Sequence, residues 1–211
     1  MFQRRATLLI LLWLVAACSS RPAAKPYDTA CFAETLPVGV GYQSPRDVEE
    51  RLLPRHDLSE LGTNAPYRIV TLRSIGPYSE PEVQLTIFEM PDGTLRGEFL
   101  APVHCSINDQ LHTLFVHNPA SSEDERIKHV RMRRTMMTDR DLPELRTIDR
   151  DFRRLRISAD LEADLVLDAR IYDLWVETPE NTLHLRSVEP ERQFQRWADG
   201  TVALLSAKFG E

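Results

Sequence analysis

Short segments in which apolar and polar residues alternate restrict the fold of this chain more than any other feature. Tyr67 to Ile75 and Val83 to Met90 both alternate, and Thr94 to Leu100 follows after Pro91-Asp92-Gly93. Successive side chains of a strand point to opposite faces of a sheet, so this alternation predicts strands with one face toward a core. Asp-Gly between two such segments is typical of a hairpin turn. The middle of the chain is therefore predicted to form antiparallel strands that follow one another directly.

A second hairpin is predicted in the C-terminal third of the chain. Apolar residues recur at every second position from Leu165 to Ile171 and again at Trp175, and several residues between them are also good strand formers. Thr178-Pro179-Glu180-Asn181 predicts a turn, and Thr182 to Val188 is the expected returning strand. Leu111 to Val116 is a further strand candidate.

Two helices are predicted from caps and periodicity. Ser44 fits an N-cap and Pro45 the first helical position of a short helix that Pro54 helps to end. Apolar residues three or four positions apart predict one stripe of a second helix, formed by Leu142, Leu145, Ile148, Phe152 and Leu155.

Two other segments fit more than one structure. Ser122 and Glu125 fit a capping box, which predicts a helix from about residue 123 to about residue 137, although valine and methionine in it also suit a strand. Near the C-terminus, the apolar spacing from Phe194 to Phe209 favours a helix, whereas Asp199-Gly200 suggests a hairpin. We favour the helix for this last segment.

Together these segments predict an α+β domain, built on an antiparallel sheet of hairpins with helices packed on one face. The strands do not alternate regularly with helices, which argues against a doubly wound parallel sheet. Hydrophobic residues make up 42% of the chain and charged residues 27%, so the chain can bury an ordinary core. We assign residues 28–211 to this single domain.

The first 17 residues have the layout of an export signal. Arg4 and Arg5 precede the apolar segment Leu8 to Val15, and the small pair Ala16-Ala17 follows it. The apolar segment is too short to cross a bilayer, which takes about 20 residues. We therefore expect residues 1–17 to be a signal peptide.

The tetrapeptide Val15-Ala16-Ala17-Cys18 resembles the lipobox of bacterial lipoproteins. This resemblance implies cleavage before Cys18 and attachment of fatty acyl chains such as palmitate to that residue, which would anchor the protein to a membrane. Ser19 is similar to an outer-membrane sorting residue, since aspartate at this position is the family's inner-membrane signal. The expected location is the cell envelope, at the outer membrane facing the periplasm. Ordinary secretion after an Ala-x-Ala-like site is the alternative.

The segment that follows Cys18 is predicted to be a tether. Residues 18–27 are mostly small, polar or proline, which is typical of a linker. Without Arg4 and Arg5 the chain has 24 basic and 32 acidic residues, a net charge of −8. A body this acidic is a poor general binder of nucleic acid or of anionic lipid headgroups.

Apart from Cys18, the proposed lipid site, the chain contains two cysteines. In an oxidising compartment an even pair is more often bonded than free, so we expect a Cys31–Cys105 disulfide. Two separate buried thiols are the alternative, and metal binding through His104-Cys105 is a weaker one, because neighbours on an extended chain point to opposite faces.

No motif with a known catalytic mechanism is recognised in the sequence. It contains no Gly-x-Ser-x-Gly, Ser-x-x-Lys or His-Glu-x-x-His motif. The histidine and carboxylate combinations that lie close in sequence are His56 with Asp57 and His104 with Asp109. Surface or satisfied side chains are the ordinary interpretation of the six histidines. We therefore predict no catalytic residue, metal site or cofactor.

Arginines and aromatic residues supply the candidate interaction residues, because Trp, Tyr and Arg dominate interface hot spots. The candidates are Trp175, Tyr172, Trp197, Arg131, Arg133 and Arg134. The arginines suit an anionic partner such as lipopolysaccharide, wall polymer or an acidic protein, or else a solvated face neutralised by nearby acids. For the aromatic residues, core packing is the role that we favour over an exposed binding site.

The function hypothesis that fits these observations is a non-enzymatic protein-binding module held at the membrane by its N-terminal lipid. Envelope assembly factors, accessory subunits and inhibitors or immunity proteins belong to this class. The alternatives are an envelope hydrolase that acts on cell-wall polymer, and a carrier of a small molecule or lipid. A carrier requires a deep apolar cavity of a few hundred Å³, and a hydrolase requires a histidine–carboxylate pair in a cleft.

Overall fold

The computed structural model describes residues 46–58, 61, 65–76, 81–156, 170–187 and 192–209. The signal peptide, Cys18, the tether, Cys31 and the strand residues expected at 165–169 lie outside these ranges. No helix within the described ranges has the length and apolar character needed to cross a membrane.

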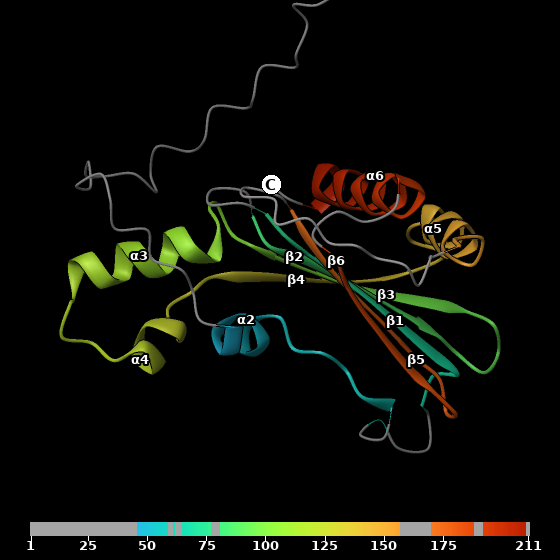
Figure 1. Cartoon of the computed structure of the whole chain (residues 1–211), viewed down its shortest axis with the longest axis horizontal. Coiled ribbons are helices and arrows are strands. Elements are labelled where there is room, and N and C mark those ends of the chain that lie inside the picture. The colour runs from blue at the N-terminus through green and yellow to red at the C-terminus, as the bar shows by residue number, and fades with distance from the viewer. Residues whose placement is uncertain are drawn as a thin grey trace, which may run out of the picture.

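In the described ranges, six strands form one sheet (Figure 1). Their spatial order is β4-β3-β2-β1-β5-β6, and every neighbouring pair is antiparallel. The strands are β1 (Arg68–Ile75), β2 (Val83–Glu89), β3 (Leu95–Pro102), β4 (Met132–Thr138), β5 (Ile171–Glu177) and β6 (Thr182–Ser187). The helices are α2 (Arg46–Leu52), α3 (Ile107–His117), α4 (Glu123–Ile127), α5 (Glu144–Phe152) and α6 (Arg192–Phe209). The predicted α+β class and the antiparallel sheet are confirmed.

The main core lies between one face of the sheet and the helices α5 and α6. Val70 and Leu72 of β1, Phe99 of β3 and Leu174 of β5 all point to this face and pack with Leu145 of α5. Because the strands alternate, the residues between these apolar side chains point to the opposite face. We call that opposite side the polar face.

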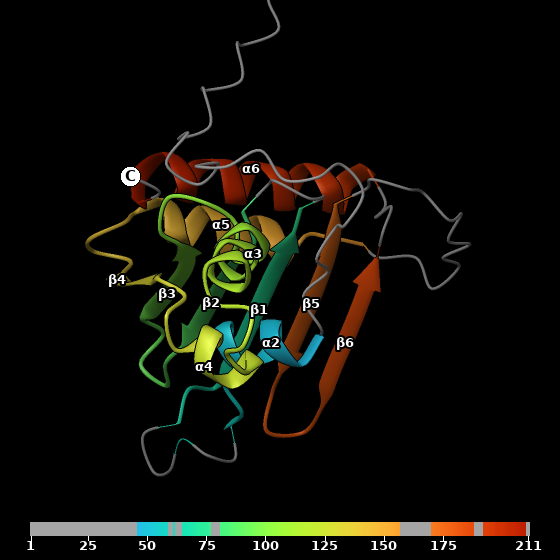
Figure 2. The same cartoon turned by 90° about the vertical axis from the view of Figure 1, so that its left-hand side faces the viewer.

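A smaller apolar cluster packs on the other side of the sheet near the end of β3. It contains Val48, Leu53, Leu100, Ile107, Leu111 and Ile127, and so joins α2, α3 and α4 to β3. Figure 1 shows α5 and α6 on one side of the sheet and α2 and α4 on the other, and Figure 2 shows the same division from a second direction. Helices therefore lie on both sides of the sheet. The sequence predicted helices on one face, and this holds for α5 and α6 but not for α2, α3 and α4.

The helix predicted at Leu142 to Leu155 is confirmed as α5, and the C-terminal helix is confirmed as α6, which continues through Asp199-Gly200. The helix expected from about residue 123 is wrong in its second half, because α4 ends at Ile127 and Met132 begins β4. The second half forms a strand because it pairs with β3, and its methionine and threonine residues tolerate a strand conformation.

The strand expected at Leu111 to Val116 is wrong, because these residues lie in α3. The Ser106 side chain accepts a hydrogen bond from the Asp109 backbone N–H at 3.0 Å, which caps the first turn of the helix. The buried residues Ile107 and Leu111 are four positions apart, the spacing of one helix face. The cap at Ser106 was the sequence signal for this helix.

Gly97 lies where the main core has no room for a side chain. A Cβ at this position would lie 2.8 Å from Cγ and 3.2 Å from Sδ of Met137 on the neighbouring strand. We expect Gly97→Ala to lower the free energy of unfolding by about 1–3 kcal/mol, because Met137 must be displaced. Urea denaturation measures the change. In the control Gly200→Ala, the added Cβ meets nothing within 4 Å, and an alanine in a helix should stabilise by up to about 1 kcal/mol.

Candidate interaction surface

Residues 53–58, which we call the strap, cross the polar face of the sheet between α2 and β1. Arg73 Nη2 donates to the carbonyl of Leu53 at 2.5 Å, and Gln84 Nε2 donates to the carbonyl of Pro54 at 2.9 Å. Farther along the strap, the Leu58 backbone N–H lies 3.4 Å from Glu177 Oε2. The strap is therefore held by long side chains that rise from the sheet.

One buried carboxylate of the polar face bridges a histidine and an arginine. Glu98 of β3 is buried, and its Oε2 contacts His56 Nε2 of the strap while its Oε1 contacts Arg134 Nε of β4. The His56 ring also packs edge-on against Phe88, with ring centroids 5.2 Å apart. Both oxygens of Glu98 are therefore engaged by cationic or hydrogen-bonding partners.

A second buried carboxylate has the same arrangement on β5. Asp173 Oδ1 lies 3.2 Å from His184 Nε2, and Asp173 Oδ2 lies 3.3 Å from Arg186 Nη1. Both partners come from β6 and reach solvent, whereas Asp173 is buried. Because both oxygens of each carboxylate are engaged, these two clusters have the character of ion-pair networks.

Trp175 stands on the polar face between two flat polar groups. The Arg73 guanidinium carbon lies 4.9 Å from the Trp175 ring centroid, and the His184 ring stacks on Trp175 at 4.7 Å with 5° between the planes. Burial lowers the pKa of the Arg73 guanidinium, and the charge of Asp173 acts in the opposite direction. Three strands thus contribute to one stack, whose outer member, His184, is exposed.

The outermost strands β4 and β6 present open edges within the described part of the chain. Val103 N donates to Arg131 O at 2.9 Å and Asp139 N donates to Leu95 O at 3.0 Å, so the odd-numbered residues of β4 bond to β3. The backbone N–H and C=O groups of Met132, Arg134 and Met136 therefore point outward.

The edge of β6 follows the same logic. Thr178 N donates to Asn181 O at 2.9 Å across the turn, which makes residues 176 and 183, and then 174 and 185, the hydrogen-bonded pairs of this hairpin. The backbone groups of Thr182, His184 and Arg186 therefore point away from β5, and their side chains lie on the polar face.

The β4 edge is basic although the chain as a whole is acidic. Residues 126–134 contain six basic or histidine side chains and no acid. Arg131 is exposed, as are Lys128 and His129 before it, and Arg134 is 59% exposed in spite of its contact with Glu98. Met136, on the same face of β4, is 58% exposed.

The structure separates the six residues that the sequence offered for interaction. Arg134 lies on the open β4 edge, and the exposed Arg131 directly precedes β4. Arg133 points to the other face of the sheet and donates to the carbonyl of Phe209 at 2.8 Å. Tyr172 and Trp197 belong to the main core, in line with the core-packing interpretation, so they are not available as exposed interaction residues. Apolar packing explains their placement, since a ring buries a large area.

The buried aromatic candidates still satisfy their polar atoms. Trp197 Nε1 donates to the Ile148 carbonyl at 3.0 Å, and the Tyr172 hydroxyl donates to Asp199. Trp175 is largely buried within its stack and offers only the edge of that stack to solvent.

Cys105 is half-buried in the turn before α3, and its carbonyl accepts from Gln110 Nε2 at 3.2 Å. Because Cys31 lies outside the described residues, the Cys31–Cys105 disulfide stays a prediction. Among the described residues no group of three or more His, Cys, Asp or Glu side chains is placed to hold a metal ion.

Sequence reasoning missed both histidine clusters. A signal for His184 existed, because a turn that pairs Thr178 with Asn181 places Trp175 directly opposite His184. No comparable signal exists for His56 and Glu98, which are 42 residues apart and meet only because the strap crosses the sheet.

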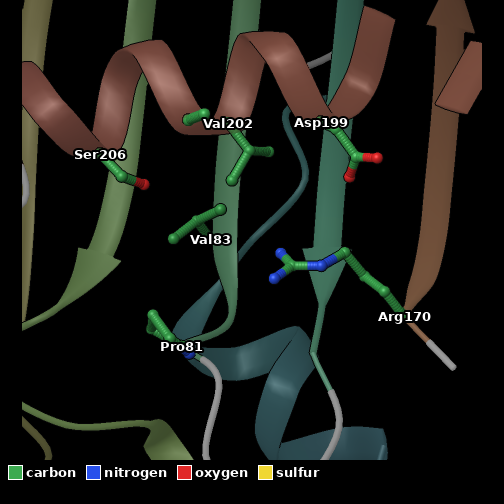
Figure 3. A pocket seen from close by; sticks show the side chains of 7 residues that line it. Pro81, Val83, Arg170, Asp199, Val202 and Ser206 are labelled. Carbon is green, nitrogen blue, oxygen red and sulfur yellow. The ribbon is translucent and has the colours of Figure 1, made fainter. Parts of the chain in front are cut away.

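A hollow of about 370 Å³ lies beside α6, at one end of β2 (Figure 3). Its lining consists of Pro81, Val83, Arg170, Asp199, Val202, Ala203 and Ser206. Arg170 donates to the Ser74 hydroxyl at 2.7 Å and Asp199 accepts from Tyr172, so charged groups occupy one side of the hollow. This mixed lining differs from the apolar cavity that the carrier hypothesis requires.

Glu82, just before β2, is a buried carboxyl group that the sequence did not single out. Its Oε2 accepts from the Ile107 N–H at 2.8 Å and its Oε1 from Asn108 Nδ2 at 3.2 Å, at the start of α3. The pKa of Glu82 is raised to about 7, mainly by burial. The backbone hydrogen bonds act against this rise, and the nearby carboxylates Glu49 and Asp109 contribute to it.

Comparison with known proteins adds no family to this description. No protein-family model and no curated protein matches the chain.

Proposed function

We propose that the chain is a lipid-anchored envelope protein, held at the outer membrane through Cys18, whose folded domain binds another protein and has no enzymatic role. An envelope assembly factor, an accessory subunit and an inhibitor or immunity protein all fit this description. The export signal and the lipobox-like tetrapeptide support the location, and the geometry of the β4 edge supports protein binding.

The observation that carries the binding proposal is the basic open edge of β4. Met132, Arg134 and Met136 direct backbone N–H and C=O groups outward, and an extended segment can pair with such an edge by adding a strand. Basic side chains surround this edge on an acidic molecule, so the complementary partner is a protein segment rich in Asp and Glu. The exposed Met136 side chain adds an apolar contact at the same face.

Binding of synthetic peptides to the full-length chain in detergent tests this edge. A peptide of alternating Glu and Val should bind, and a peptide of alternating Lys and Val should not, as measured by fluorescence anisotropy. The variant Lys128→Glu/Arg131→Glu should weaken binding roughly tenfold or more, because it reverses two exposed charges beside the edge. The control Arg150→Glu changes a charge on α5 and should leave binding unchanged.

Equal binding of the acidic and basic peptides, or the same loss in the control, would refute the β4 assignment. In cells, a photo-crosslinking amino acid at Met136 should capture a defined envelope protein, and the charge-reversed variant should lose that product. A captured protein that survives the charge reversal would contradict the proposed chemistry.

The anchor is tested separately by metabolic labelling with palmitate. The full-length chain should incorporate label, and Cys18→Ala should lose all of it, because that thiol is the expected acylation site. Cys31→Ala should remain labelled. An intact mass with the N-terminal leader still attached, or label that persists in Cys18→Ala, would overturn the lipoprotein assignment while leaving the β4 proposal standing.

A further inference from the structure

The edge of β6 differs from the edge of β4 in a way that selects a different occupant. Thr182, His184 and Arg186 direct their backbone N–H and C=O groups outward along this edge. Four residues of β6 are exposed: Thr182, Leu183, His184 and Arg186. No described strand pairs with this edge. The strand contains no proline or glycine, residues that would weaken pairing at an edge.

We propose that β6 pairs with β6 of a second copy of this chain, antiparallel and with a two-fold axis at His184. This arrangement joins the two sheets into one continuous sheet and makes a closed dimer, the commonest form of protein assembly. The inference is independent of the proposed function, because β4 remains open in both copies.

The backbone of β6 is suited to this register. With the axis at His184, the outward groups of His184 face those of His184 in the second copy, and Thr182 faces Arg186 of the second copy. Each of these residue pairs exchanges both N–H and C=O bonds, the pattern of narrow pairs in an antiparallel ladder. Every outward backbone group of the strand thus gains a partner.

The side chains are also compatible with their own copies. Leu183, which is 55% exposed, would lie opposite Leu185 of the second copy on the face that carries α6. Arg186 would lie about 13 Å from its own counterpart, since four residues along a strand separate them. Each Arg186 also pairs with Asp173 of its own chain. The two Arg186 side chains are therefore not placed directly opposite one another.

The stack on the polar face is continuous with this axis. His184 lies flat on Trp175, which in turn lies against Arg73. Two such stacks would meet at the two His184 rings, so the stacking partner of each ring on its open side is the ring of the second copy.

The same pairing is disfavoured for β4. An axis at the corresponding outward residue, Arg134, would place two arginines directly opposite each other, and like charges in cross-strand pairs are destabilising. The two edges of the sheet therefore suit different partners: an acidic segment at β4 and a second copy at β6. Pairing through a strand of 6 residues buries less surface than a standard interface, which covers about 1,600 Å². We therefore expect the dimer to form at micromolar protein concentration or above.

Cysteine crosslinking in membranes that contain the full-length chain tests the register. His184→Cys should form a disulfide dimer with itself, because facing residues of a narrow pair have Cα atoms about 5.5 Å apart, within disulfide range. Co-expressed Thr182→Cys and Arg186→Cys should crosslink to each other, while Arg186→Cys alone should not. The unaltered chain, with its own cysteines, gives the baseline on the same gel.

A dimer from Arg186→Cys alone, or no dimer from His184→Cys, would overturn the proposed pairing. A second measurement uses no added cysteine. Sedimentation of the full-length chain in detergent should show a monomer–dimer equilibrium that Leu183→Lys shifts toward monomer by tenfold or more. Tyr67→Lys, which replaces a residue that is 61% exposed elsewhere, should leave the equilibrium unchanged, and an equal effect of both variants would refute the interface.

Discussion

Lowering the pH from 8 to 5 is expected to raise the free energy of unfolding by roughly 2–3 kcal/mol through Glu82 alone. The pKa of this carboxyl group is about 7 in the folded protein, against 4.5 as its ordinary value. A raised carboxyl pKa means that the folded state binds the proton more tightly than the unfolded state, so protonation stabilises the fold. The stabilisation is complete below about pH 4.5 and is lost as the pH rises through 7, at about 1.4 kcal/mol per pKa unit.

Urea denaturation across this pH range measures the effect. In Glu82→Gln the neutral amide should remove the Glu82 contribution at every pH, whereas Glu50→Gln, at an exposed position of α2, should keep the slope of the unaltered chain. Glu82→Gln differs from the unaltered chain at Glu82 alone, so the difference between their slopes isolates this group. Identical slopes for Glu82→Gln and the unaltered chain would contradict the prediction.

Acidification below this window should reverse the trend. The guanidinium groups of Arg68 and Arg153 bind Glu89 and lower its pKa, although its partial burial acts in the opposite direction. A carboxylate with a lowered pKa loses its stabilising contribution as the pH falls through its folded value. The stability of the domain should therefore pass through a maximum on the acidic side of neutrality.

The second large effect is expected for Arg73→Met, which should lower the free energy of unfolding by about 3–5 kcal/mol. The substitution removes a buried cation that donates to the Leu53 carbonyl and to Gln84 Oε1 at 3.2 Å, and that lies over Trp175. It also leaves the buried carboxylate of Asp173 with less opposing charge. Removing one partner of a buried charge pair is strongly destabilising because the other charge remains buried.

Chemical denaturation of Arg73→Met measures the loss of unfolding free energy, and a double variant identifies which interaction causes that loss. Arg73→Met/Asp173→Asn should recover part of the lost stability, since it removes the uncompensated charge. Arg96→Met, at an exposed position of β3, should change stability by less than about 0.5 kcal/mol. A double variant no more stable than Arg73→Met would show that the hydrogen bonds to the strap, rather than the charge, carry the effect.

The elements that the sequence predicted are those with local signals. The hairpin of β2 and β3 follows from Asp92-Gly93 between alternating segments, and α5 follows from its apolar stripe. The pairing of β1 with β5 has no local signal, because Ile69 and Glu177 meet across more than a hundred residues. Only the packing of the whole core selects that neighbour.

The polar face shows a second limit of prediction. Alternation indicates which residues share a face, but it assigns polar residues such as Thr71 and Glu98 to solvent by default. In the structure both residues are buried. The Thr71 hydroxyl meets that of Thr86 on β2, and the strap supplies the His56 imidazole to Glu98. Arg131 and Arg134 could be singled out from charge alone, whereas their position at an open edge depended on β4 being a strand.

The way the strap is held has a mechanical consequence. The strap is the first extended segment of the described chain. Separate hydrogen bonds, an ion pair and the buried Leu53 side chain hold it on the sheet, and it takes no part in a strand ladder. Under tension applied at the N-terminal side of α2, such contacts break one after another, and each break costs little compared with shearing β1 away from both its neighbours. Residues 46–58 would therefore detach and extend first, and the edge strands β4 and β6 would stay folded while the domain is under tension.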